Sequence, residues 1–173
     1  WEETYGDQYY NEALAIDEIE PGRYKFIVNN SNQETWTHTS QYEIDANGNV
    51  INEYILQNQQ TNFDYYIYQI KDNNNGFLLI GSTQTDGLVL KIDSLGNKEW
   101  SEKISAGEYT NEFLRRGVQL EDGSYILCGS TDYNLEGDNT FRGWLVKLSE
   151  TGQLIWSKVY KHDDDNLAEY FED

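Results

Sequence analysis

The chain has 173 residues, of which 31 are acidic and 12 basic, and its formal net charge is −19. A surface this negative repels nucleic acid and anionic lipid, so neither is expected as a partner. Hydrophobic residues make up 38% and aromatic residues 14% of the chain, which excludes a disordered polymer and is enough for one ordinary domain with a core. No apolar run reaches the roughly 18 residues of a membrane span, so no transmembrane segment is predicted.

Twelve strands are predicted, in three consecutive groups of four. Short runs rich in Tyr, Ile, Val and Thr alternate with turn residues, and no stretch has a helical period. Alternation is clearest at Tyr24, Phe26 and Val28. The predicted strands are residues 12–18, 23–30, 36–45 and 49–56, then 64–71, 77–82, 88–93 and 97–104, then 112–121, 124–130, 143–149 and 153–160.

Glycines repeat at about fifty-residue intervals, which is the length of a four-stranded propeller blade. Two independent sets mark the period, at positions 22, 76 and 123 and at positions 48, 96 and 152. Each lies between two predicted strands, where Gly and Asn adopt positive φ at little cost. The sequence therefore predicts an all-β propeller built from four-stranded antiparallel blades, over residues 11–60, 61–108 and 109–160.

The two ends of the chain are out of phase with this repeat. Residues 1–6 match 100–104 and 156–160, so residues 1–10 are predicted to be the last strand of a preceding blade. Residues 166–170 match 111–114, so residues 161–173 are predicted to begin a following blade. Closed propellers have about four to eight blades. We therefore expect a piece of a longer protein, completed by further blades of that protein or by another chain.

Two of the three units resemble the β-propeller repeat of many secreted or surface-anchored bacterial proteins. That repeat reads D-G-G-Y-I-I-A-G-S-T and, after a variable loop, K-L-D-x-x-G-N-x-x-W. It is matched by residues 122–131 with 144–156, and by residues 91–93 with 96–100. The first unit departs from it, with Pro21-Gly22 at the first turn and Asn52 at the Trp position. The resemblance implies an extracytoplasmic adhesin-like or scaffold lipoprotein role and transfers no catalytic residue.

Trp and Gly positions in the repeat predict contacts between blades. Trp100 and Trp156 each follow a turn Gly by four residues, like the tryptophan-docking motif of quinoprotein-like propellers. A Trp at this position is expected to pack between adjacent blades and bury roughly 200 Å². The small residues of 81–83 and 129–131 should allow neighbouring backbones to approach closely.

No residue is predicted to be catalytic, to hold a cofactor or to bind a metal. His38 and His162 lack metal-ligand spacing, and residues 163–165 (three Asp) are interpreted as a solvated acidic loop. The segments 45–49 and 93–97 superficially resemble calcium loops, but Asp and Asn also serve hairpin turns, which we favour. Arg115-Arg116 could clamp an anion but is expected to pair with acidic neighbours, and the single cysteine, Cys128, is expected to be a buried inert thiol.

The loops between second and third strands vary most, at residues 29–35, 83–87 and 132–142. Loops on a rigid scaffold are where binding concentrates. The longest carries side chains that suit glycan or protein contacts, Tyr133, Asp138, Phe141 and Arg142, although ordinary loop variation explains them as well.

The favoured function is a non-catalytic structural or protein-binding module of a secreted or cell-surface bacterial protein. The alternatives are a carbohydrate-binding module that uses exposed Tyr and Trp, and a propeller enzyme whose active site lies in other blades.

Overall fold

A computed structural model describes residues 4–5, 10–31, 36–58, 65–107, 111–132 and 141–160. These ranges contain twelve strands and no helix, so none of the described residues forms a helix able to cross a membrane. The strands are β1 (Tyr10–Glu20), β2 (Arg23–Ser31), β3 (Trp36–Asp45), β4 (Val50–Asn58), β5 (Tyr65–Lys71), β6 (Phe77–Ser82), β7 (Gly87–Ile92), β8 (Lys98–Ile104), β9 (Glu112–Gln119), β10 (Tyr125–Thr131), β11 (Arg142–Leu148) and β12 (Leu154–Tyr160). Every predicted strand is present, with ends that agree to within two residues.

The strands form three four-stranded sheets, each made of four consecutive strands. We call them the first sheet (β1–β4), the second sheet (β5–β8) and the third sheet (β9–β12). All neighbouring strands pair antiparallel. The predicted all-β fold of four-stranded antiparallel blades is confirmed.

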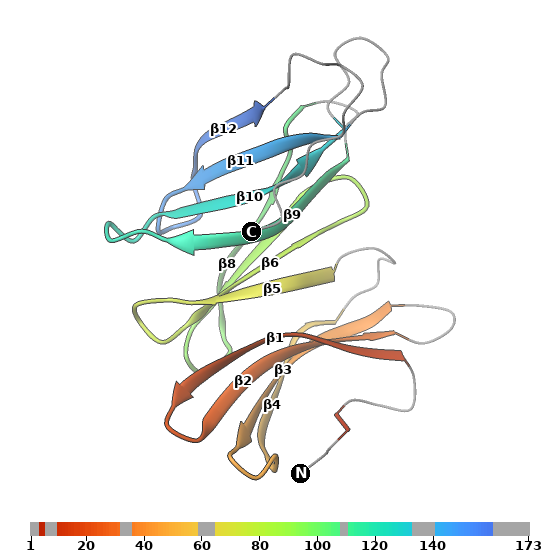
Figure 1. Ribbon diagram of the computed structural model, residues 1–173, viewed down its shortest axis with the longest axis vertical. Coiled ribbons are helices and arrows are strands. Elements are labelled where there is room, and N and C mark those ends of the chain that lie inside the picture. Colours follow the sequence, from red (N-terminus) through yellow and green to blue (C-terminus); the bar gives the residue numbers. More distant parts are fainter. Residues whose placement is uncertain are drawn as a thin grey trace.

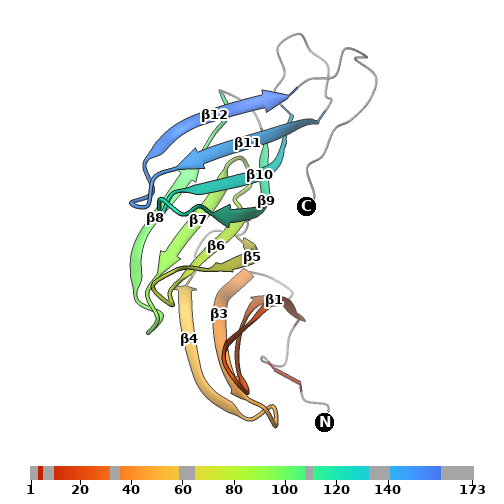
Figure 2. The same cartoon turned by 60° about the vertical axis from the view of Figure 1, so that its left-hand side comes forward.

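The sheets stack face to face in sequence order, so the second sheet is enclosed by the other two (Figures 1 and 2). The first strand of each sheet lies against the preceding sheet: β5 contacts β1 and β2, and β9 contacts β5, β6 and β7. In propellers the first strand of each blade lies at the centre of the ring. The three described sheets form an arc of such blades, and the partial blades predicted at residues 1–10 and 161–173 lie almost entirely outside the described residues.

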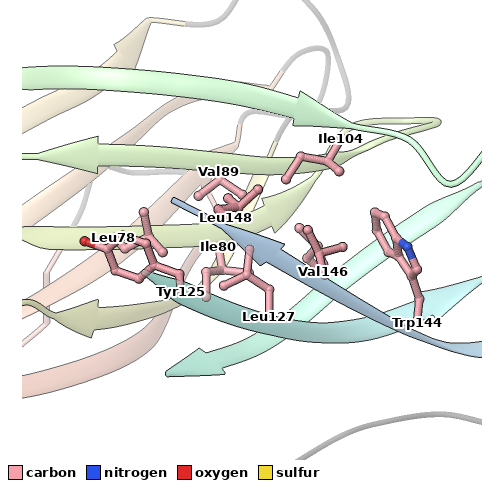
Figure 3. Close-up of a cluster of buried hydrophobic side chains, with 10 residues drawn as sticks. Leu78, Ile80, Val89, Ile104, Tyr125, Leu127, Trp144, Val146 and Leu148 are labelled. Atoms are coloured by element: carbon pink, nitrogen blue, oxygen red, sulfur yellow. The ribbon is translucent and has the colours of Figure 1, made fainter. Parts of the chain in front are cut away.

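Two apolar cores lie between the sheets. Between the second and third sheets, Leu78, Ile80 and Val89 meet Leu127 and Val146, all with no exposed surface (Figure 3). Between the first and second sheets the core is built on Ile27, Tyr66, Phe77, Leu79, Leu88, Leu90 and Ile92. Burying one such side chain stabilises the fold by about 1.5–3 kcal/mol, so the stacking of sheets, rather than any single sheet, holds the structure together.

Glycine at the end of the second strand allows the close approach that the sequence predicts. A Cβ on Gly81 would lie 1.9 Å from the backbone oxygen of Tyr65, and one on Gly129 would lie 1.8 Å from that of Phe113. Strand pairing shifts register at both places. No side chain larger than hydrogen fits there, which explains the repeated Gly-Ser-Thr.

One turn differs from the prediction. Gly22 and Gly123 have positive φ values of 77° and 81°, but in the second unit the left-handed residue is Asn75, with φ 61°. Gly76 serves another purpose, because a Cβ there would lie 2.4 Å from the backbone oxygen of Ile92. The repeat therefore aligns Asn75, not Gly76, with the two turn glycines.

Candidate interaction surfaces

The hairpins that join the last two strands of each sheet have the same internal structure. In the first, the Asp45 carboxylate accepts hydrogen bonds from the backbone nitrogens of Asn47 (2.8 Å) and Asn49 (2.9 Å) and from the Asn49 side chain (2.8 Å). Asp93 accepts the equivalent three bonds in the second. In the third, the Ser149 hydroxyl accepts one from the backbone nitrogen of Gln153 at 3.0 Å.

Through these hydrogen bonds the Asp45 and Asp93 carboxylates stabilise their own hairpin turns. The same bonds lower the pKa of Asp45 and Asp93, chiefly through the side chains of Asn49 and Asn97, which favour the charged form. The two segments that resemble calcium loops are thus explained by the turn itself. Among the described residues, no group of three or more His, Cys, Asp or Glu side chains could hold a metal ion.

Each hairpin glycine in the second and third sheets receives an aromatic ring from the preceding sheet. Gly152 has φ 83°, and a Cβ on it would lie 2.7 Å from the ring of Trp100. The Trp100 indole nitrogen donates to the backbone oxygen of Glu150 at 3.2 Å, and its ring packs edge-on against Tyr125, 6.3 Å between centroids. The predicted packing of Trp100 between adjacent blades is confirmed.

The first sheet makes the same contact with a different residue. Asn52 pairs with Glu43 as Trp100 pairs with Lys91, so Asn52 does occupy the Trp position. The ring comes instead from Tyr54, two residues further along the same strand, and a Cβ on Gly96 would lie 2.6 Å from it. Because side chains of a strand return to the same face every second residue, Tyr54 reaches the glycine that Asn52 cannot cover.

Buried charges at the sheet interfaces are held in pairs. Lys91 forms an ion pair with Asp72, and both side chains are almost fully buried. The ammonium also contacts Glu99 at 3.0 Å and donates to the backbone oxygen of Ile92 at 3.0 Å. The Asp72 carboxylate accepts from the backbone nitrogen of Gly76 at 2.7 Å. These groups fix the β5–β6 turn against the last two strands of the sheet.

A polar network joins the first and second sheets around Gln69. Its amide nitrogen donates to the Asp17 carboxylate at 2.7 Å and to the backbone oxygen of Lys25 at 3.0 Å, and its oxygen accepts from Gln41 at 3.3 Å. Burial raises the pKa of Asp17 against the opposing effect of the Gln69 hydrogen bond. Burial, with the nearby Arg23 charge, lowers the pKa of Lys25.

A polar cleft of about 350 Å³ opens at the rim of this interface. It is lined by side chains of both sheets: Ile19, Glu20, Arg23, Lys25, Glu43, Asn52, Tyr54, Asn75, Ser94 and Leu95. Arg23 bridges Glu20 and Glu43, and the buried Lys25 lies 3.9 Å from Glu43. The two cations and two carboxylates of its lining are thus grouped around Glu43 and Arg23.

An apolar groove of about 290 Å³ lies on the opposite face of the first sheet. Tyr5 borders it, with its ring 5.0 Å from that of Phe26 and its hydroxyl donating to the backbone oxygen of Gly48 at 2.6 Å. Phe26 and Tyr42 are buried beneath, at 5% and 8% exposure. Tyr5 therefore already covers part of this face.

The remaining candidate residues are scattered. His38 lies half-buried on β3, and its backbone oxygen accepts from Asn30 at 3.4 Å. Arg116 stacks over the Tyr68 ring, 4.5 Å from its centroid, and donates to the backbone oxygen of Arg115. Residues His162, 163–165, Tyr133 and Asp138 lie outside the described residues. Phe141, just before β11, has its ring centroid 5.9 Å from that of Phe113, and Arg142, predicted to be in the loop, is the first residue of β11 and is buried at 6% exposure.

The prediction of a buried Cys128 is wrong, because its side chain is only half-buried. Its side chain lies on the face of the third sheet turned away from the second, because it alternates with the core residue Leu127. The apolar neighbours in sequence suggested burial on both faces, but only one face of this sheet meets another described sheet.

Comparisons with known proteins find structures of similar fold but no family for this chain. No family model matches the sequence, and no curated protein matches it. A crystal structure of the eukaryotic initiation factor matches with a TM-score of 0.54 and 11% identity, over 88% of this chain and 33% of that one. A protein of unknown function from Bacteroides caccae matches with a TM-score of 0.43 and 12% identity, over 87% of this chain and 68% of that one.

The chain spans about a third of the initiation-factor chain it matches. At 11% identity the likeness concerns the fold alone, and the matched structure is propeller-like. The match to the initiation-factor structure thus agrees with a propeller-like fold.

Proposed function

We propose that the chain is a non-catalytic structural or protein-binding module that works outside the bacterial cytoplasm. The observation that carries the proposal is the use of its carboxylates in ion pairs and in turns. Asp72 and Lys91 neutralise each other, Glu43 holds Arg23, and Asp45 and Asp93 are saturated by turn hydrogen bonds. A catalytic carboxylate needs access to substrate and a pKa suited to proton transfer, whereas these groups serve the scaffold.

Further support comes from the stiffness of the assembly. Adjacent sheets are joined by an apolar core, and ring-on-glycine contacts lock their hairpins. Such a scaffold holds its surface loops in fixed positions, which lowers the entropy lost when a partner docks.

The test combines activity and binding on the intact chain. Chromogenic glycoside, ester and phosphate substrates should show no turnover above buffer. A photo-crosslinking residue at the exposed Ile155, introduced in cells that make the protein, should give one defined protein adduct, and none when placed at the buried Ile80. Turnover that is abolished by Glu43→Gln would refute the proposal in favour of an enzyme.

A carbohydrate-binding role is the second candidate, favoured by the polar cleft. Tyr54, Asn52 and Asn75 give it an aromatic ring and two amides, the groups that sugar hydroxyls and ring faces contact. A glycan array distinguishes the two roles. Dose-dependent binding of one glycan class that Asn52→Ala weakens would establish this role, whereas signal equal to that of an unrelated acidic protein would exclude it.

A further inference from the structure

The face of the third sheet turned away from the second repeats a surface that is buried elsewhere in the molecule. We call it the outer face of the third sheet and define it by Ile126, Cys128, Leu145, Lys147, Trp156 and Tyr160. Strand pairing sets the membership: Ile126 is opposite Lys147, which is opposite Trp156, and Cys128 is opposite Leu145.

Each of these positions has a counterpart in the second sheet. Leu78 is opposite Lys91, which is opposite Trp100, and Ile80 is opposite Val89. There the third sheet covers the face, and Leu78, Ile80 and Val89 have no exposed surface. On the outer face of the third sheet the equivalent side chains are half-buried. The contrast is largest at the strand end, where Ile104 is 5% exposed and Tyr160 is 41% exposed.

Trp156 is in the position of Trp100. Trp100 lies on the hairpin glycine of the next sheet. No described sheet follows β12, which carries Trp156. The Lys158 ammonium lies 5.4 Å from the centroid of the Trp156 ring. Ile155, the unpaired residue next to Trp156 at the register shift of β11 and β12, is 53% exposed. An apolar surface of this kind costs free energy in water and marks an interaction site.

We propose that the outer face of the third sheet binds a further four-stranded unit of the same repeat, whose hairpin glycine at positive φ receives the Trp156 ring. Two successive interfaces in this molecule place an aromatic ring on a hairpin glycine, and the outer face of the third sheet carries the ring for a third such interface. The proposal rests on the proposed function, since it names the partner of a structural module.

A second copy of this chain fits the surface less well. Its second and third sheets offer hairpins whose glycines already hold Tyr54 and Trp100. Its first sheet offers the Gly48 hairpin, but Tyr5 already donates to the Gly48 oxygen, and the apolar residues behind it are buried. Docking there requires displacement of Tyr5.

Cys128 provides the readout, because it is the only cysteine and lies on the surface concerned. The test uses the full chain with residues 109–160 duplicated in tandem, the added copy carrying Cys128→Ser. The rate at which an aromatic disulfide reagent labels the remaining thiol should fall at least about tenfold relative to the unmodified chain, because a covered thiol reacts only after local opening. The matched control adds Gly152→Val in the new copy, which blocks the seat for Trp156 and should restore much of the rate.

An unchanged rate in a duplicated chain with proportionally higher strand content by circular dichroism would overturn the proposal. The proposal would also be overturned if labelling of the unmodified chain became slower at higher protein concentration and light scattering gave the mass of a dimer. A second copy of the chain would then be the occupant. A further measurement does not depend on the folding of the duplicated chain. With Cys128→Ser and Ile80→Cys combined, the covered thiol at position 80 should react at least about tenfold more slowly than Cys128 does, and equal rates would show that the outer face of the third sheet is already closed. Enzymatic turnover would remove the proposed function without altering any of these rates.

Discussion

Replacing Gly152 by Ala tests the lock between the second and third sheets. The substitution has two costs. An L-residue at φ 83° loses about 1–2 kcal/mol relative to Gly, and a Cβ 2.7 Å from the Trp100 ring must displace that ring, an overpacking that typically costs about 1–3 kcal/mol. The expected loss in the free energy of unfolding is therefore about 2–5 kcal/mol, as the sum of the two effects.

Gly22→Ala is the matched control. Gly22 has nearly the same φ, 77°, but a Cβ there would meet only the Ala46 methyl at an ordinary 3.4 Å. It should cost the backbone part alone, about 1–2 kcal/mol. Urea denaturation followed by circular dichroism gives the free energy of unfolding of both variants. If the free energy falls with urea concentration at the same slope in both, unfolding exposes the same amount of surface in both.

A double-mutant cycle separates the two costs of Gly152→Ala. With Trp100→Ala in the background the ring is absent, so the substitution should cost no more than Gly22→Ala does. If Gly152→Ala cost the same with and without Trp100, the contact between ring and glycine would contribute nothing to stability, and the reasoning for both interfaces would fail.

Three other substitutions, with Lys98→Met as a control, test the charged groups. Lys91→Met leaves the buried Asp72 carboxylate without its partner and should lower the free energy of unfolding by about 3–5 kcal/mol, whereas Lys98→Met at an exposed site of the same sheet should change it by less than about 0.5 kcal/mol. Asp17→Asn should raise the urea midpoint at pH 7, because burial raises the pKa of Asp17 and its ionised form therefore opposes folding. That gain should begin to shrink as the pH falls through this raised pKa, and it should disappear below the unfolded pKa of about 4. The pKa of Asp93 is lowered instead. The Asp93 carboxylate therefore contributes to the free energy of unfolding above its unfolded pKa of about 4, and this contribution is lost as the pH falls through the folded pKa. Asp93→Asn should make stability less sensitive to pH below about 4, as measured by urea midpoints at pH 6 and pH 3.

Much of the fold follows from local sequence. Alternation and Asn-Gly turns place the strands because both are properties of a few adjacent residues. The packing of Trp100 between sheets was predicted from its place in the repeat, four residues after Gly96, but the glycine that its ring covers, Gly152, lies in the next sheet and was not identified. Antiparallel pairing within each unit then follows from the shortness of the turns.

Features that depend on strand register or on a neighbouring sheet were not predictable. Asn75 and Gly76 both tolerate positive φ, and only the three-dimensional turn shows which of them needs it. Tyr54 substitutes for a missing Trp because of the face it occupies. The half-buried state of Cys128 depends on what lies beyond its sheet, about which the apolar strand around it carries no information.

The β7–β8 hairpin faces both of its neighbours at once. Gly96 receives Tyr54 from the sheet before it, and Trp100, four residues later, lies on Gly152 of the sheet after it. The β7–β8 segment thus carries both the glycine that receives a ring from the preceding sheet and the ring that covers a glycine of the following sheet. Duplication of a gene segment encoding one repeat adds a ready-made joint at both ends, so a protein of this kind gains or loses blades without having to evolve a new interface.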